Sequence, residues 1–373
     1  MKHTISDQRI VIKVGTSTLT AGKKELNLPT FVDMARQIAK LLETGKEVVL
    51  VTSGAIAAGR ELMRKNVNNQ QIPAKQMLAA IGQPRLMEIY AQVFRIYGIS
   101  VAQVLLTRAD LVQRRGYINA RNTITALLDN KILPIVNEND AVATEEIRVG
   151  DNDNLSALVA NLIEADLLIL LTDQAGLYTS DPRSNAKAKL IKLIKEPEIP
   201  EEIWQAAGGS GSGMGVGGML TKIKAADLAR RSGTTVIIAK GDEKDILPRL
   251  MDHEELGTSI SPLISKVESR KRYFLAGMKT SQVTIQIDTG AVQALRSGSS
   301  LLPIGVLSVT GKFDRGDIVQ IVQEDEKPVG IGLVSYDSDD VKKICKHRSE
   351  EIEAIIGYNF GDEVVHRSNL VLL

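Results

Sequence analysis

Two lysines occupy positions where an ammonium group could bind phosphate. Lys13 lies inside the apolar stretch 9–15 (RIVIKVG), just before Gly15. Lys222 ends the segment 208–222 (GGSGSGMGVGGMLTK), in which seven of the first eleven residues are glycine. Glycine lets backbone N–H groups approach an anion closely, and the helical pattern that begins at Lys222 adds the partial positive charge of a helix N-terminus. We therefore interpret both positions as candidate phosphate contacts.

The glycine-rich segment fits neither of the two common phosphate-binding motifs. Gly213, Gly215 and Gly218 match GxGxxG, but no convincing strand precedes them, as a dinucleotide fingerprint requires. A Walker A motif needs Gly-Lys-Ser/Thr, whereas here Thr221 precedes Lys222. A flexible linker is the alternative interpretation of the segment. For Lys13 the alternative is a lysine that lies on an edge strand or reaches out to solvent.

Composition excludes several other kinds of chemistry. Cys345 is the only cysteine and the four histidines lack metal-ligand spacing, so a disulfide within the chain is impossible and a zinc site or Cys/His nucleophile is not indicated. Aromatic residues make up 3% and the net charge is +1, which gives little for base stacking or for attraction to nucleic acid and membranes. The polar N-terminus and the lack of a long apolar run favour a cytoplasmic protein without a membrane partner.

The elements that must position the lysines follow from the apolar pattern. Short apolar runs predict strands, and helical spacing separates most of them; we expect that spacing to be interrupted near 68–73 and at Pro84. Continuous apolar strands alternating with helices predict an α/β fold, a three-layer αβα sandwich with a mostly parallel central sheet. The predicted strands cover 9–15, 47–54, 100–107, 132–140, 167–173 and 234–241, and the clearest helices cover 28–45, 153–165 and 222–233.

Small, polar and acidic residues follow four of these strands. Parallel sheets bind ligands at the carboxyl ends of their strands, so these segments predict one lined cleft. The segments are GTSTLT (15–20), TSGA (52–55), NEND (137–140) and TDQAG (172–176). NEND could instead be an ordinary polar turn that binds nothing. In the segment GDNDN (150–154), Asp153 could likewise serve only as a helix cap.

The pattern changes near residue 262. We expect one domain over 1–260, a linker over 261–276 and a small, mainly β domain over 277–373 with one helix near 338–347. From Gly277 to the C-terminus the chain carries 10 lysines and arginines against 14 aspartates and glutamates, and 10 − 14 gives a net charge of −4. An acidic domain neutralises few phosphates, so the charge argues against strong RNA binding.

Six segments in the first domain, in order, resemble those of glutamate 5-kinases, within the amino acid kinase superfamily. The C-terminal part resembles a PUA domain. The six segments are VIKVGTSTLT (11–20), VTSGAIAAGR (51–60), NENDAVA (137–143), VGDNDNLSA (149–157), LLTDQAGLYTSDPR (170–183) and GGMLTK (217–222).

The resemblance implies ATP-dependent phosphorylation of the γ-carboxylate of L-glutamate to L-glutamyl 5-phosphate, the first step of proline biosynthesis. It also implies Mg²⁺, feedback inhibition by proline and a homo-oligomer, a dimer or a tetramer. The chemistry is consistent with the composition, because a carboxylate is already an anion at neutral pH and needs no general base. Positioning and charge neutralisation must then lower the barrier.

The resemblance also implies roles for particular residues. Lys13 and Lys222 would flank the transferred phosphoryl group, with Asp153 holding both ammonium groups. Glutamate would contact Ser53, Gly54, Asp140 and Asn152, and no residue is assigned as a metal ligand. The nucleotide would contact the two lysines together with Gly15, Thr172, Asp173, Val216, Gly217, Gly218, Met219, Leu220 and Thr221.

Two residues depart from the family pattern, and three alternative functions stay open. Val216 stands where relatives often have threonine, and Arg148 stands where some have lysine, so we assign Arg148 no catalytic role. The chain could instead phosphorylate aspartate or N-acetylglutamate, or it could bind RNA through the PUA domain. A nucleotide acceptor is disfavoured because NEND would place acidic groups beside it.

Overall fold

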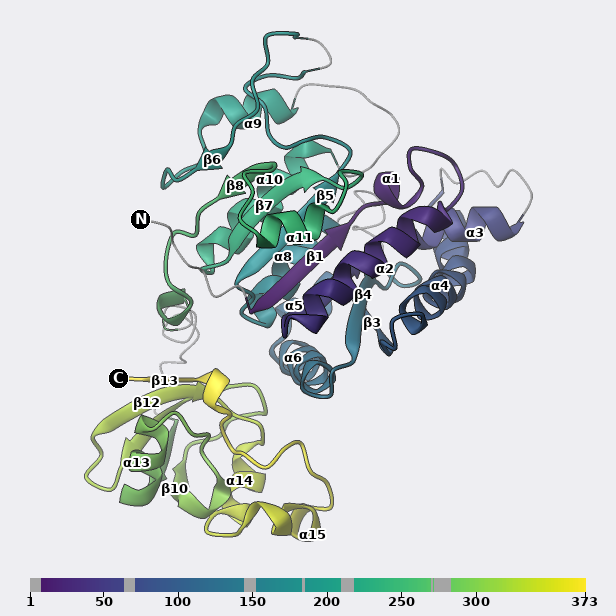
Figure 1. Cartoon of the computed structure of the whole chain (residues 1–373). Coiled ribbons are helices and arrows are strands. Elements are labelled where there is room, and N and C mark those ends of the chain that lie inside the picture. The colour runs from purple at the N-terminus through teal and green to yellow at the C-terminus, as the bar shows by residue number, and fades with distance from the viewer. Residues whose placement is uncertain are drawn as a thin grey trace. The chain divides into compact units, whose positions relative to one another are not determined.

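The computed structural model describes residues 8–63, 71–143, 152–182, 185–208, 218–269, 271 and 283–373. The chain divides into two compact units, of which the first comprises Met1–Leu111 and Ala120–Ser265 and the second comprises Val112–Asn119 and Lys266–Leu373. Each unit has its own β-sheet (Figure 1).

The sheet of the first unit is mostly parallel, as the apolar pattern predicts. Its described strands follow the order β3-β4-β2-β1-β5-β7-β8-β6, with the short strand β8 antiparallel to β7. The strands are β1 (Arg9–Val14), β2 (Glu47–Thr52), β3 (Val101–Leu106), β4 (Leu133–Glu138), β5 (Leu167–Thr172), β6 (Leu193–Ile194), β7 (Thr235–Lys240) and β8 (Thr258–Ile260).

Among the described elements, helices separate all of these strands along the chain except β5 and β6 (Figure 1). They are α1 (Thr16–Leu19), α2 (Leu28–Glu43), α3 (Ala55–Met63), α4 (Ile72–Arg95), α5 (Arg108–Val112), α6 (Arg114–Asp129), α8 (Asn152–Leu162), α9 (Glu201–Gly208), α10 (Met219–Arg231) and α11 (Ile246–Met251).

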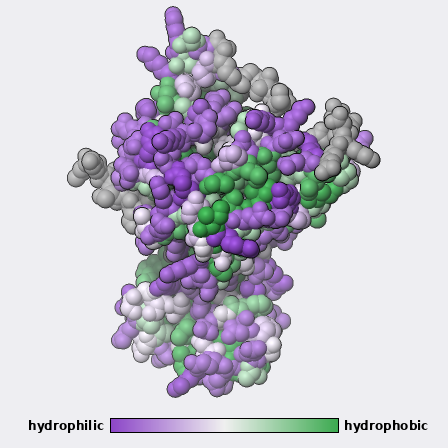
Figure 2. Space-filling model, turned by 45° about the vertical axis from the view of Figure 1, so that its right-hand side comes forward, coloured by the Kyte–Doolittle hydropathy of each residue, from purple (hydrophilic) through white to green (hydrophobic). Residues whose placement is uncertain are grey.

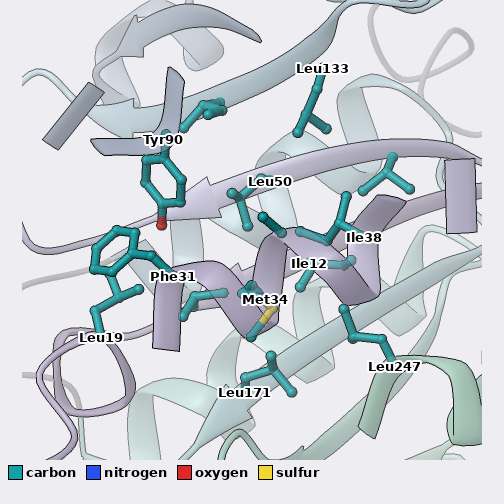
Figure 3. Packing of buried hydrophobic residues seen from close by; sticks show 14 of the residues in the cluster. Ile12, Leu19, Phe31, Met34, Ile38, Leu50, Tyr90, Leu133, Leu171 and Leu247 are labelled. Atoms are coloured by element: carbon teal, nitrogen blue, oxygen red, sulfur yellow. The ribbon is translucent and has the colours of Figure 1, made fainter. Parts of the chain in front are cut away.

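The alternation of side chains along β1 explains why helices cover both faces of the sheet. Ile10, Ile12 and Val14 belong to a core cluster shared with α2, α4 and α11 (Figure 3). The residues between them, Val11 and Lys13, point to the opposite face, because successive side chains of a strand alternate. That opposite face is covered by α8, which packs against β1. The three-layer αβα arrangement is therefore confirmed.

Local signals fix the ends of α2. The side chain of Asn27 caps the helix by accepting from the backbone N–H of Thr30, with a proline in the first turn. The chain leaves the helix through Gly45, whose φ of +78° lies in the left-handed region that favours glycine. Phe31, Met34 and Ile38 then face the sheet, as Figure 3 shows.

The expected interruption at Pro84 is wrong, because α4 runs unbroken from Ile72 to Arg95. Proline lacks an N–H group, so it removes one hydrogen bond from the helix interior. Packing on both sides of the proline offsets this loss: Leu78 lies before it, Leu86 and Tyr90 lie after it, and all three are buried. Tertiary packing here overrides the local preference of proline.

Two glycines let α3 and α4 pack with their backbones almost in contact. A Cβ added to Gly82 of α4 would lie 1.8 Å from the carbonyl oxygen of Ala55, and one added to Gly59 of α3 would lie 2.0 Å from that of Leu78. The neighbours are backbone atoms, which cannot rotate away. This close contact positions the start of α3, directly behind the predicted Ser53–Gly54 site.

We expect Gly82→Ala to lower the free energy of unfolding by about 3 kcal/mol, because the methyl group forces the two helices apart. Urea denaturation of the purified protein measures this. Gly290→Ala is the matched control, since that glycine is also helical and its added Cβ would meet only a carboxylate oxygen of Asp288, at 3.3 Å. The control is expected to be neutral or slightly stabilising. A Gly82→Ala variant as stable as the control would contradict the packing argument.

The second unit is built on a five-stranded sheet with the order β10-β9-β11-β12-β13. Its neighbours are antiparallel except β9 and β11. The expectation of one helix here is wrong, because α13, α14 and α15 all lie in the described part of this unit. The elements are β9 (Thr284–Ile287), α13 (Thr289–Arg296), η1 (Pro303–Gly305), β10 (Val306–Thr310), β11 (Ile318–Gln323), β12 (Pro328–Leu333), α14 (Ser338–Ile344), η2 (Ser349–Glu351), α15 (Ile352–Ile356), η3 (Arg367–Asn369) and β13 (Leu370–Leu372).

The surface is mainly hydrophilic on the face seen in Figure 2, with one apolar area on the first unit. Among the exposed apolar side chains are Leu28 and Val32 of α2 and Met77 of α4, each at least 40% exposed. Within the described residues, no helix combines the length and apolar character needed to cross a membrane.

Candidate active site

The first lysine of the predicted site lies in the centre of the sheet. Lys13 is in β1, where it pairs with Val51 of β2 on one side and Leu170 of β5 on the other. The edge-strand alternative is therefore wrong. Lys13 is only 5% exposed. A buried ammonium group is costly unless an anion compensates its charge, so this position demands a partner.

The second lysine lies in the first turn of α10. The helix begins at Met219, three residues before the start that the sequence predicts, and Gly218 is its N-cap. No side chain among the described residues caps this end. The N–H of Thr221 donates to the carbonyl oxygen of Gly218 at 3.1 Å, whereas the first N–H groups of a helix have no partner within it and can donate to an anion. Lys222 is also only 5% exposed.

Asp153 joins the two lysines. It is the second residue of α8 and is 1% exposed. Its Oδ1 lies 2.6 Å from Nζ of Lys13, and its Oδ2 lies 3.1 Å from Nζ of Lys222. The hydroxyl of Thr221 also donates to Oδ2, at 2.6 Å. The structure therefore brings together residues from three elements that are distant in sequence.

The lysines determine the charge state of this carboxylate. Burial alone would raise the pKa of Asp153, but the positive charges of Lys13 and Lys222 outweigh it and hold the pKa well below its ordinary value. Asp153 is therefore ionised at neutral pH. One carboxylate against two ammonium groups leaves an excess of positive charge, which suits a phosphate or another anion.

The residues predicted for the acceptor gather at the carboxyl end of β2. Ser53 follows this strand directly, and its hydroxyl accepts a hydrogen bond from Nδ2 of Asn152 at 3.0 Å. Asn152 is the first residue of α8, next to Asp153. Gly54 has a φ of +106°, a conformation that strains any other residue. The tight turn thereby places Ser53 beside the lysine pair.

Asp140 lies at the carboxyl end of β4, the strand next to β2. It lines a hollow of about 220 Å³ together with Glu138, Asn139, Gln83 and other residues of α4 and β3. The lining combines two carboxylates and three amides with apolar residues, which are four alanines, Pro84 and Leu105. Such a surface suits a small ligand that carries a positive charge.

The residues predicted for the nucleotide lie at the ends of β1 and β5. A Cβ on Gly15 would lie 3.2 Å from Nζ of Lys13, so the glycine leaves space beside the ammonium group. Thr172 ends β5, and its hydroxyl donates to Asp173 at 2.9 Å. Met219 and Leu220 begin α10 and are half-buried.

Five residues discussed from the sequence lie outside the described residues. They are Val216, Gly217, Arg148, Gly213 and Gly215. Gly218, which follows the first two, is the N-cap of α10.

Two residues near the acceptor position were given no individual role from the sequence, although Asn137 belongs to the NEND segment that predicts the cleft. Asn137 is 1% exposed and Gln83 is 9% exposed, and the amide nitrogen of Asn137 donates to Oε1 of Gln83 at 2.8 Å. The signal for Asn137 was its place as a polar residue at the end of an otherwise apolar run, ILPIVN. Gln83 gave no signal, because a single polar residue in a helical pattern is usually on the surface.

Groups of histidine, cysteine and acidic side chains able to hold a metal ion are absent from the described part of the chain. The donor set at the lysine pair is cationic, so it favours the oxygens of a ligand rather than a bare metal ion.

Comparison with known proteins identifies the class to which this fold and lysine site belong. Residues 8–240 match the family model described as Amino acid kinase family, and residues 283–356 match the model of the PUA domain. A solved structure of UMP kinase from Bacillus anthracis covers 68% of this chain and 96% of its own, with 17% sequence identity and a TM-score of 0.46.

Curated relatives match nearly the whole chain. It is 50% identical to the glutamate 5-kinase of Herpetosiphon aurantiacus, over 97% of this chain and 98% of that protein. It is 49% identical to the glutamate 5-kinase of Shewanella oneidensis, over 99% of each, and 48% identical to that of Deinococcus radiodurans, over 98% of this chain and 100% of that protein. The chain therefore belongs to the amino acid kinase family and, within it, to the glutamate 5-kinases.

Proposed function

We propose that the protein transfers the γ-phosphoryl group of ATP to the γ-carboxylate of L-glutamate, giving L-glutamyl 5-phosphate and ADP in the first step of proline biosynthesis. The observation that carries this proposal is the convergence of Lys13 and Lys222 on Asp153. The similarity to glutamate 5-kinases over nearly the full length supports the choice of acceptor.

The reaction requires charge neutralisation more than proton transfer. An oxygen of the γ-carboxylate attacks the γ-phosphorus while the bond to the bridging oxygen of ADP breaks, and ADP leaves with the electron pair. Both reactants are anions, so repulsion opposes their approach. Lys13 and Lys222 offset this repulsion and neutralise charge that develops on the phosphoryl oxygens. Asp153 holds both ammonium groups in place before the substrates bind, which avoids reorganisation during the reaction.

The acceptor and the nucleotide approach this pair from different sides. In the proposal, Ser53, Gly54 and Asn152 contact the amino acid, and the carboxylate of Asp140 contacts its α-ammonium group. The nucleotide lies over Thr172 and Asp173 with its phosphates at the N-terminus of α10, where the partial positive charge of a helix end favours an anion. Mg²⁺ bound to the phosphates of ATP would supply further charge neutralisation.

The location, assembly and regulation of the enzyme are also part of the proposal. We place it in the cytoplasm, as a homo-oligomer that proline inhibits, and we assign the PUA domain a regulatory or stabilising role. The apolar area in Figure 2 supports self-association, because surface areas of this kind are typical of protein contacts. The net charge of −4 after residue 276 supports a role for the PUA domain other than RNA binding.

A panel of acceptors tests the proposed function. ADP release is expected with ATP, Mg²⁺ and L-glutamate, and to be at least a hundredfold slower with L-aspartate, N-acetyl-L-glutamate or UMP at equal concentration. Aspartate is one methylene shorter, and the acetyl group removes the positive charge that Asp140 would contact. Turnover that is as fast with any of the other three acceptors would overturn the choice of glutamate.

A further inference from the structure

A chain of side-chain amides leads away from Ser53 into the protein. Nδ2 of Asn152 donates to the hydroxyl of Ser53 at 3.0 Å and to Oδ1 of Asn137 at 3.3 Å. Nδ2 of Asn137 donates to Oε1 of Gln83 at 2.8 Å, and Nε2 of Gln83 donates to Oε1 of Gln103 at 3.0 Å. Gln103 is exposed, whereas the three amides before it are at least 91% buried.

One backbone group sets the direction of this whole chain. The two ends of an amide side chain have nearly the same shape, and only the hydrogen-bond partners distinguish oxygen from nitrogen. The backbone N–H of Glu138 donates to Oδ1 of Asn137 at 2.9 Å. A backbone N–H can only donate, so this contact requires the oxygen of Asn137 at that place. Asn137 must then offer its nitrogen to Gln83 and accept from the nitrogen of Asn152.

These contacts also determine the orientation of the Asn152 amide. Its nitrogen is committed to Ser53 and Asn137, and its Oδ1 is buried with no hydrogen-bond partner among the described residues. The residue as a whole is 8% exposed. A buried carbonyl oxygen without a donor is unfavourable, so this atom needs a donor from a ligand.

The chemistry of the acceptor identifies the donor. At neutral pH both carboxylates of an amino dicarboxylic acid only accept hydrogen bonds, and the α-ammonium group is the one that donates, with three N–H bonds. An oxygen at this place therefore recognises the ammonium group, whereas a nitrogen there would repel it. Three donors also allow the ammonium group to contact Asp140 at the same time.

We propose that Asn137, held in turn by Gln83, is a positioning residue that orients the Asn152 amide so that its oxygen accepts from the α-ammonium group of the acceptor. This inference rests on the proposed function, since it takes L-glutamate as that acceptor. Without Asn137 the amide of Asn152 is free to turn over, because the hydroxyl of Ser53 can either donate or accept.

The experiment compares L-glutamate with glutarate, which has the same two carboxylates and no ammonium group. The measured quantity is the ratio of the KM for L-glutamate to the inhibition constant of glutarate. Asn137→Leu is expected to raise this ratio about tenfold, because it weakens a hydrogen bond that only L-glutamate makes. Asn137→Asp is expected to leave the ratio unchanged or lower it, since a carboxylate still accepts from Asn152. Gln92→Met, which changes an exposed amide of α4 that does not line the hollow, is expected to have no effect.

Two results would overturn the inference. The first is an Asn137→Leu enzyme in which both constants rise by the same factor, which is what a general disturbance of the site would produce. The second is an Asn137→Asp enzyme whose ratio rises as far as that of Asn137→Leu.

A further variant, Gln83→Met, provides the test if Asn137→Leu does not fold. Gln83→Met removes the acceptor of Asn137, and it is expected to raise the ratio two- to fivefold; an unchanged ratio would then decide against the inference. Failure of the proposed function looks different, since the unmodified protein would then release no ADP with L-glutamate. The inference fails only in an enzyme that does phosphorylate L-glutamate.

Discussion

Lys222→Met is expected to lower kcat by about a hundred- to a thousandfold, the loss typical when one preorganised charge that contacts the reacting group is removed. Methionine keeps most of the length of the side chain and removes its charge. Asp153 still has Lys13 at 2.6 Å, so its buried carboxylate stays paired and the fold survives. The KM for L-glutamate is expected to change less than threefold, because the lysine acts on the phosphoryl group rather than on the amino acid.

The control for this variant lies on the same helix. Lys224 is two residues further along α10 and is exposed, so Lys224→Met removes the same charge from the surface. Steady-state ADP release measures both variants, and the control should match the unmodified enzyme within twofold. Lys222→Met with more than a tenth of normal kcat would mean that the lysine pair holds the fold together without taking part in the transfer.

Lys13 illustrates how much of the candidate site the sequence can predict. An ammonium group inside an apolar run predicts a partner, and the turn that begins at Gly15 is consistent with an anion nearby. The identity of the partner is not a local property, since Asp153 lies 140 residues further along the chain. Only the resemblance to a family indicated Asp153, whereas the physical reason, a buried carboxylate between two cations, became visible with the fold.

Local patterns failed where packing decided the outcome. Pro84 predicts a break in a helix, but buried residues on both sides hold α4 straight through it. Gly82 predicts weak helix formation, whereas its real role is to let the backbone of α3 approach. Gln83, between them, is an ordinary polar residue by sequence, and its contact with Asn137 depends on how α4 lies against β4. The periodicity of a sequence does not indicate which distant elements come into contact.

Asp153→Asn is expected to lower the free energy of unfolding by about 3–5 kcal/mol at pH 7, and to reduce kcat as well. The change removes the negative charge that lies 2.6 Å from Nζ of Lys13 and 3.1 Å from Nζ of Lys222, and removing one partner of a buried ion pair costs about this much. Asparagine has the same shape as aspartate, so packing is preserved. Urea denaturation of both proteins measures the difference in stability.

The pH dependence of that difference provides an independent check. The pKa of Asp153 is lower in the folded protein than in the unfolded chain, so its charge stabilises the fold above the unfolded pKa of about 3.9 and this contribution is lost as pH falls further. The difference in the free energy of unfolding between the unmodified protein and Asp153→Asn should therefore be constant from pH 5 to pH 7. It should decrease below about pH 4.

A double variant separates charge from shape. Lys13→Met together with Asp153→Asn removes both charges of one ion pair, so the double change should cost clearly less than the sum of the single changes. The same reasoning holds for Lys222→Met with Asp153→Asn. Two outcomes would mean that Asp153 acts through its hydrogen bonds and shape instead of through its charge. One is a loss of stability in the double variant that equals the sum of the single losses. The other is a difference in stability between Asp153→Asn and the unmodified protein that is as large at pH 3 as at pH 7. The carboxylate would then not be what gathers the two ammonium groups.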